Sequence, residues 1–105
     1  MRQTRDVNEV LAADDVHAVI ISTPAATHHA LARKAMEAGK DVYVEKPVSH
    51  NIHEGREIIA AAAKYNRIVQ AGTQYRSDRG LQQAAAYIHE GHLGKVLWGH
   101  VVWYE

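Results

Sequence analysis

Three short clusters of polar and conformationally restricted residues could do chemistry, because each directly follows a β-branched run. The clusters are Ser22-Thr23-Pro24, Glu45-Lys46-Pro47 and Gly72-Thr73-Gln74-Tyr75-Arg76. The second is the most specific, since a carboxylate and an ammonium side by side are costly to bury without a partner or a task. Lys46 could bind a substrate hydroxyl or tune a proton transfer, and Glu45 could accept hydrogen bonds from ribose hydroxyls. A surface ion pair at a turn is the alternative.

Two prolines restrict these clusters. Thr23 and Pro24 precede an alanine-rich segment over residues 25–38, so they predict a helix cap followed by a proline at the first helical position. The N–H groups of such a helix start could contact a phosphate or a ribose, and an ordinary capped helix is the alternative. Pro47 holds Lys46 in extended conformations and permits a cis peptide bond.

The runs ahead of the clusters predict three buried strands. They span residues 18–21, 42–44 and 67–70 and are apolar without alternation, which is typical of a parallel sheet covered on both faces. Between them, alanine-rich segments carry apolar residues at helical spacing. The stripes are Leu31, Ala35 and Ala38; Ile52, Ile59, Ala62 and Ala63; and Leu81, Ala84, Ala85 and Ile88. Asn51 with Glu54 has the spacing of a capping box.

The order of these elements predicts the fold class. A short helix over residues 6–13 comes first, and a β-type run over residues 96–104, with Trp98, Trp103 and Tyr104, comes last. We expect an α/β fold, part of a doubly wound parallel sheet formed by a βαβαβ half with helices on both faces. The three clusters then lie at one edge of the sheet, where ligands bind in such folds. The last run is expected to open a new sheet.

Composition and motifs exclude several classes of function. Acidic and basic residues are balanced at 12 each without a run of like charges, so nucleic acid is not an expected partner. No apolar stretch approaches the ~20 residues that span a bilayer, so no membrane partner is expected. The chain has eight histidines but no cysteine and no HExxH pattern, so no metal site is predicted. A GxGxxG loop and a serine-centred nucleophile elbow are both absent.

Taken together and in order, the motifs resemble those of the Gfo/Idh/MocA oxidoreductases. They are Ile21-Ser22-Thr23-Pro24, His28, Ala38-Gly39-Lys40, Val44-Glu45-Lys46-Pro47 and Gly72-Thr73-Gln74-Tyr75-Arg76. The resemblance implies a Rossmann domain for NAD or NADP in residues 1–94, with residues 95–105 opening a substrate domain. It implies that Lys46 is catalytic and that the cofactor contacts Ser22, Thr23, Pro24, His28, Glu45, Lys46 and Gln74. Lys46 and Arg76 would contact the substrate, and the peptide bond before Pro47 would be cis.

The resemblance also implies parts that this sequence does not contain. The family's glycine-rich first βαβ unit would precede Met1, and the substrate domain with its Asp/His acid–base pair would follow Glu105. We therefore expect a piece of a parent enzyme that moves hydride between nicotinamide and a sugar-like or polyol alcohol. The 105 residues alone should bind dinucleotide very weakly and show no turnover, and their unpaired sheet edge should cause self-association or marginal stability.

Two other readings stay open. A non-catalytic nucleotide-binding or assembly module could reuse the same scaffold, and a truncated reading frame would have no function at all. For a full-length parent we expect a cytoplasmic enzyme that can form a homo-oligomer, with an exported parent as the alternative. The sequence decides neither between NAD and NADP nor between possible substrates or redox directions.

Overall fold

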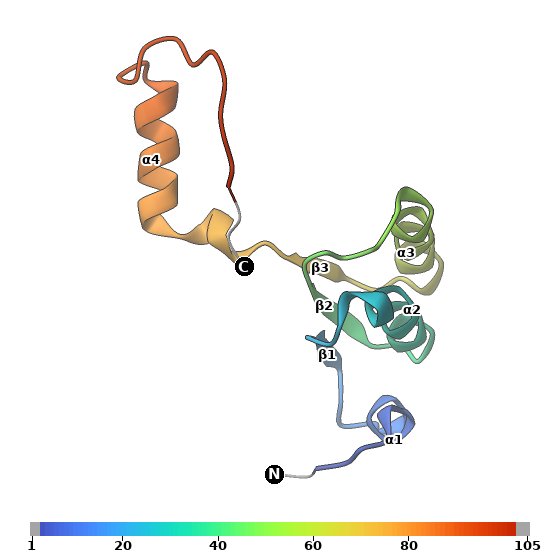
Figure 1. The fold of residues 1–105 in the computed structure, drawn as a ribbon. Coiled ribbons are helices and arrows are strands. Elements are labelled where there is room, and N and C mark those ends of the chain that lie inside the picture. Colours follow the sequence, from blue (N-terminus) through green and yellow to red (C-terminus); the bar gives the residue numbers. More distant parts are fainter. Residues whose placement is uncertain (1–2, 103–105) are drawn as a thin grey trace. The chain divides into compact units, whose positions relative to one another are not determined.

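The computed structural model describes residues 3–102, which divide into two compact units at the boundary between Thr73 and Gln74 (Figure 1). The first unit contains α1 (Val7–Ala12), β1 (Ala18–Ile21), the 3-10 turn η1 (Ala25–Thr27), α2 (His28–Glu37), β2 (Asp41–Glu45), α3 (Ile52–Tyr65) and β3 (Val69–Gly72). The second contains the 3-10 turn η2 (Gln74–Ser77) and α4 (Arg79–His89). The predicted helices and the three predicted strands are all present. No helix among the described residues is long and apolar enough to cross a membrane.

The three strands form one parallel sheet in the order β1-β2-β3, which confirms the predicted α/β fold class. The third strand starts later than the sequence pattern predicts, at Val69 rather than Arg67. Helix α3 ends at Tyr65, and the left-handed backbone of its C-cap residue Asn66 (φ 51°) redirects the chain toward the sheet. The Arg67 side chain then donates hydrogen bonds to the carbonyl oxygens of Tyr65 and Gly39. Arg67 therefore joins the ends of two helices and does not extend the strand.

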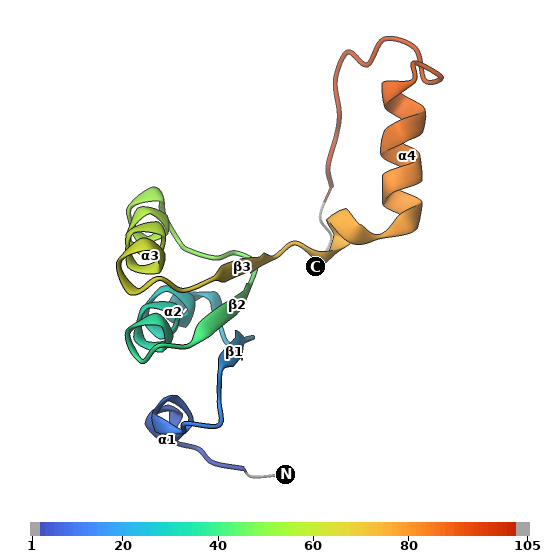
Figure 2. The same cartoon turned by 180° about the vertical axis from the view of Figure 1, so that it is seen from behind.

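Helices α2 and α3 contact each other and lie on the same face of the sheet, as both views of the ribbon show (Figures 1 and 2). For this unit, the expectation of helices on both faces is therefore corrected. Two right-handed crossovers that advance in the same direction across a parallel sheet place their helices on the same side. A doubly wound sheet obtains its second helical layer from strands that are added in the opposite direction.

The core lies between this helical layer and the sheet. It consists of apolar side chains, most of them small: Leu11, Ile21, Ala32, Ala35, Met36, Val42, Val44, Ile58 and Ala61. The predicted helix stripes are only partly right, because Ala38 is exposed and Ile52 and Ile59 are 77% and 71% exposed. Both helices are thus rotated relative to the stripes that the sequence pattern predicts.

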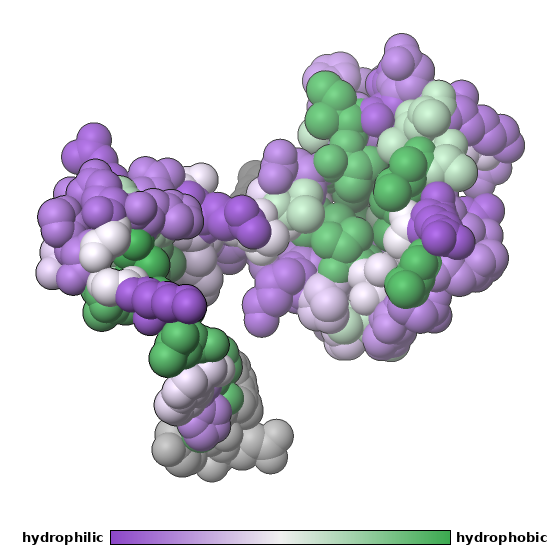
Figure 3. Space-filling view, turned by 90° about the horizontal axis from the view of Figure 1, so that it is seen from above, coloured by the Kyte–Doolittle hydropathy of each residue, from purple (hydrophilic) through white to green (hydrophobic). Residues whose placement is uncertain are grey.

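Apolar side chains also lie on the surface of the first unit, where Figure 3 shows hydrophobic residues in green among hydrophilic ones. Ile20 is 78% exposed, so β1 is not covered on both faces as predicted. An open groove beside α3 and β3 is lined mainly by apolar residues, among them Val48, Ile52, Ile58, Ile59, Ala62 and Val69. The composition of the strands suits a sheet with two covered faces, whereas the helices of this unit cover one.

The N-terminus of α3 contains the predicted capping interaction. The Asn51 side chain accepts a hydrogen bond from the Glu54 N–H (2.9 Å), and the Glu54 carboxylate accepts one from the His50 N–H (2.8 Å).

We expect Asn51→Ala to lower the free energy of unfolding by about 0.5–2 kcal/mol, because an N–H of the first turn loses its acceptor. Urea unfolding measures this loss, with Arg56→Ala at an exposed position of α3 as the control. Equal losses in the two variants would contradict the capping role.

The second unit is built around α4, whose N-terminus is capped by Asp78 through the Leu81 N–H (3.0 Å). Residues 95–102 form no strand, so the β-type run predicted over residues 96–104 is wrong in its described part. A strand persists only where a neighbour pairs with its N–H and C=O groups, and this run has no such neighbour among residues 74–102. Trp103 and Tyr104 lie outside the described residues. The boundary between residues 94 and 95 stays a prediction.

Candidate functional site

The polar clusters that follow β1 and β2 meet the end of β3 at one edge of the sheet. Because the strands are parallel and Ile21 pairs with Val44, Ser22 leaves β1 beside Glu45 of β2. Glu45 pairs in turn with Gly72, the last residue of β3. We call this region the carboxyl edge and define it by Ser22, Thr23, Pro24, Glu45, Lys46, Pro47 and Gly72. The predicted meeting of these strand ends is thereby confirmed.

The Ser-Thr-Pro loop differs from the predicted helix start. Pro24 has an extended backbone (φ −56°, ψ 139°), and η1 separates it from α2, which begins at His28. The 3-10 turn forms because Thr27 donates both its N–H (2.9 Å) and its hydroxyl (2.8 Å) to the Pro24 carbonyl oxygen. Thr23 does not cap a backbone N–H, since its hydroxyl lies 2.7 Å from that of Thr27. Ser22, Thr23 and Pro24 are therefore exposed ahead of the helix.

The Glu45 side chain lies against the end of β3. A Cβ added at Gly72 would come within 3.0 Å of both the Cα and the Oε2 of Glu45, so this carboxylate occupies space that only a glycine leaves open. Lys46 follows with an exposed side chain, and the Lys46–Pro47 bond is cis, as predicted. The carboxyl edge thus combines a carboxylate supported by a neighbouring strand with an ammonium that solvent reaches.

His28 connects two loops of the carboxyl edge from inside the fold. Its side chain is 1% exposed. Its Nδ1 lies 2.8 Å from the carbonyl oxygen of Pro47, and its Nε2 lies 2.8 Å from the carbonyl oxygen of Thr23. The ring therefore bridges the Ser-Thr-Pro loop and the Glu-Lys-Pro loop. The predicted contact between His28 and the cofactor stays a prediction.

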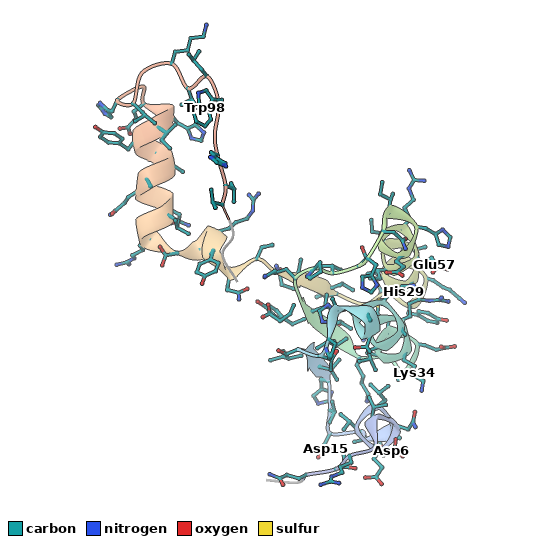
Figure 4. All side chains as sticks on the ribbon, viewed as in Figure 1. Asp6, Asp15, His29, Lys34, Glu57 and Trp98 are labelled. Carbon is teal, nitrogen blue, oxygen red and sulfur yellow. The ribbon has the colours of Figure 1, made fainter. Side chains whose placement is uncertain are left out.

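A second polar cluster lies where α2 packs on α3, and the sequence analysis missed it. Figure 4 shows His29 and Glu57 close together, with His29 Nε2 at 2.8 Å from Glu57 Oε2 and Arg33 Nη1 at 3.5 Å from Glu57 Oε1. The first contact has the distance of an ion pair but not the direction of a hydrogen bond. No group of three or more His, Asp or Glu within residues 3–102 is placed to hold a metal ion. The cluster joins the two helices that support the carboxyl edge.

Lys40, which belongs to the Ala38-Gly39-Lys40 motif, has a structural role. Its side chain is largely buried, and its Nζ donates a hydrogen bond of 2.8 Å to the carbonyl oxygen of Ala13. Ala13 is the C-cap of α1, where a positive charge is favourable because the carbonyl groups of the last turn point toward it. Lys40 therefore fixes the first helix against the turn that leads into β2.

Gln74 and Arg76 begin the second unit, in η2, and both are exposed. The Arg76 carbonyl oxygen accepts a hydrogen bond from the Gln82 side chain, which links η2 to α4. The predicted contacts of Gln74 with the cofactor and of Arg76 with the substrate stay predictions.

The chemistry of the carboxyl edge fits a ligand that carries both hydroxyl groups and negative charge. Ser22 and Thr23 offer hydroxyls, Glu45 offers an acceptor for ligand hydroxyls, and Lys46 offers an exposed cation. Gly72 leaves the end of β3 without a side chain, so the Glu45 carboxylate can lie over it. This donor and acceptor set suits the ribose and phosphate groups of a dinucleotide, which binds at this edge in doubly wound sheets.

Comparison with known proteins also indicates a fold that binds a dinucleotide. Residues 1–73 match the family model GFO_IDH_MocA, described as an oxidoreductase family with an NAD-binding Rossmann fold. The chain is 35% identical over 94 residues to the uncharacterized oxidoreductase YhhX of Escherichia coli, covering 90% of this chain and 27% of that protein. It is 33% identical over 98 residues to inositol 2-dehydrogenase of Rhodococcus jostii, with coverages of 92% and 27%.

Solved structures share this architecture. KijD10, a 3-ketoreductase from Actinomadura kijaniata solved with TDP-benzene and NADP, superimposes with a TM-score of 0.78 at 27% identity. That match covers 82% of this chain and 27% of KijD10. The chain spans about a quarter of the length of the curated relatives it matches. By the match of residues 1–73, the chain belongs to the Gfo/Idh/MocA oxidoreductase family and has its NAD-binding Rossmann fold.

Proposed function

We propose that the whole protein is an NAD(P)-dependent oxidoreductase that transfers hydride between nicotinamide and the CH–OH group of a sugar-like or polyol alcohol. The observation that carries this proposal is the placement of Lys46 beside Glu45 at the carboxyl edge of a sheet whose family binds NAD. The name inositol 2-dehydrogenase, borne by one relative, supports a polyhydroxylated substrate. The NADP in the KijD10 structure supports a nicotinamide dinucleotide as the cofactor.

Each residue of the carboxyl edge would bind a different part of the ligands. Ser22, Thr23 and Pro24 line the path of the dinucleotide, and Glu45 accepts hydrogen bonds from ribose hydroxyls. We also propose Gln74 as a contact of the cofactor and Arg76 as a contact of the substrate. The bound dinucleotide supplies the acceptor for the hydride.

Lys46 would act on the substrate hydroxyl. Its ammonium group donates a hydrogen bond to the hydroxyl oxygen, orients the C–H bond for hydride departure and stabilises the negative charge that grows as the proton leaves. We propose that a histidine outside these 105 residues takes the proton. This division of roles makes Lys46 the catalytic residue of the chain.

Titration of NADH and NADPH into the 105-residue chain tests the proposal. We expect weak saturable binding, reduced roughly three- to tenfold by Lys46→Ala and by Glu45→Ala, because each substitution removes a polar partner of the ligand. Nucleotide fluorescence or calorimetry gives the dissociation constants. Lys64→Ala and Glu37→Ala are matched controls, since both residues lie in last turns of helices that run away from the carboxyl edge.

The outcomes separate the proposal from its rival. Binding that the two carboxyl-edge substitutions weaken and the two controls do not would support the assigned roles. Binding unchanged in Lys46→Ala and Glu45→Ala would contradict them. A defined oligomer in analytical ultracentrifugation that binds neither nucleotide at millimolar concentration would favour a non-catalytic assembly module.

A further inference from the structure

The His28 ring is enclosed between two backbone carbonyl groups that lie on different loops. One belongs to Thr23, five residues before it, and the other to Pro47, nineteen residues after it. Both N···O distances are 2.8 Å, at the short end of the range for N–H···O hydrogen bonds. At 1% exposure, the ring is shielded from bulk solvent.

The chemistry of the two partners fixes the number of protons on the ring. A carbonyl oxygen only accepts hydrogen bonds, so each ring nitrogen must donate. A neutral imidazole carries one N–H and one lone pair, and at 2.8 Å that lone pair would face the lone pairs of a carbonyl oxygen. An imidazolium ion donates from both nitrogens, and charge-assisted hydrogen bonds have this length. Both tautomers of the neutral ring leave one of the two contacts repulsive.

A buried cation requires a favourable environment, and several carboxylates lie on the elements that contact α2. The ionisable side chains are Asp41, Tyr43 and Glu45 on β2, and His53, Glu54, Arg56, Glu57, Lys64 and Tyr65 on α3; β1 and η1 carry none. Glu57 contacts His29 and Arg33, and the Glu54 carboxylate accepts a hydrogen bond from the His50 N–H. Lys46 is the neighbouring cation on the Pro47 loop, with Glu45 beside it. The two carbonyl dipoles directly face the ring and supply its immediate stabilisation.

We propose that His28 is a buried imidazolium ion and a positioning residue that holds the Ser-Thr-Pro loop and the Glu-Lys-Pro loop at a fixed separation. Thr23 and Pro47 adjoin the residues assigned to the cofactor and the substrate. His28 therefore sets the distance between the dinucleotide contacts of Ser22 and Thr23 and the ammonium group of Lys46. The consequence for ligand binding rests on the proposed function, whereas the charge state of the ring does not.

The charge state is tested first on the unmodified chain. In a long-range 15N–1H NMR spectrum of uniformly 15N-labelled protein at pH 7, we expect the Nδ1 and the Nε2 of His28 both to have the shifts of protonated nitrogens. The assignment comes from sequential connectivities and from the loss of these signals in His28→Gln. A spectrum with one protonated and one unprotonated nitrogen would overturn the proposal.

The positioning role is tested with a neutral and a cationic replacement. His28→Gln offers a neutral amide, whereas His28→Lys keeps a positive charge that can donate to one of the two acceptors. We expect NADH affinity to fall about tenfold in His28→Gln, because hydrogen bonds from a charged donor are lost, and to be partly restored in His28→Lys. His53→Gln, on the exposed face of α3, should bind as the parent does. Unchanged affinity in folded His28→Gln would overturn the positioning role.

The two proposals fail in distinguishable ways. If neither nucleotide binds to any variant, the binding roles assigned to Lys46 and Glu45 in this chain fail, and the NMR spectrum still decides the charge state. A second outcome is that nucleotides bind, that Lys46→Ala lowers their affinity, and that the His28 ring carries only one proton. The proposed function then holds, and the imidazolium bridge is wrong. If His28→Gln does not fold, the spectrum of the unmodified chain still decides whether the ring bridges the loops as a cation.

Discussion

Replacement of Gly72 by alanine is expected to lower the free energy of unfolding by about 1–3 kcal/mol, the usual cost of adding a methyl group to a filled site. The added Cβ would lie 3.0 Å from the Cα of Glu45, 3.0 Å from its Oε2 and 3.1 Å from its Cδ. The carboxylate can swing away, but the Cα belongs to the backbone of β2. The end of β3 must therefore separate from β2, which weakens the pairing of Glu45 with Gly72.

Urea unfolding of Gly72→Ala, Glu45→Ala and the double variant separates the loss of stability caused by the Glu45 side chain from the loss caused by the Glu45 backbone. In the double variant the contacts with the Oε2 and the Cδ disappear while the contact with the Cα persists, so part of the stability should return. Gly99→Ala is the matched control, because a Cβ at Gly99 meets nothing within 4 Å. If Gly72→Ala and Gly99→Ala were equally stable, the close approach of the strands would be refuted.

The sequence predicts the sheet and its carboxyl edge well because each rests on a local signal. β-branched runs mark β1, β2 and β3, and the helices between them require parallel strands with all carboxyl ends on one side. The Asn51 and Glu54 pair likewise follows from a fixed spacing along one helix. These features need no knowledge of distant contacts, so sequence patterns suffice to predict them.

The orientation of the helices could not be predicted in the same way. In α2, alanines occur around most of the helix, so apolar spacing alone does not select one face. The predicted stripe of Leu31, Ala35 and Ala38 misses His28 and Met36, the two largest fully buried side chains of the helix. A histidine at the start of a helix gives no apolar signal, and its burial depends on the carbonyl group of Pro47, nineteen residues away.

The difference between local sequence signals and contacts with distant residues also explains why the strand predicted at residues 96–102 is wrong. β-branched and aromatic residues around Trp98 predict a strand from local composition. A strand also needs a partner for its backbone groups, and the local sequence contains no information about one. Local patterns therefore predict where a strand can form, and pairing decides whether it does.

Met36→Ala is expected to lower the free energy of unfolding by about 2–5 kcal/mol, because it leaves a cavity where α2 packs on the sheet. Met36 is fully buried at 0% exposure, and it belongs to the same core as Val44 of β2, one residue before Glu45. Small domains are stable by only about 5–15 kcal/mol, so this one substitution should produce the largest loss of any proposed here. Urea unfolding of Met36→Ala and of Ile59→Ala, an equally apolar residue that is 71% exposed, makes the comparison. Similar losses in both variants would mean that α2 does not form the packed layer that supports the carboxyl edge, and His28 at the first position of that helix could not then hold the two loops together.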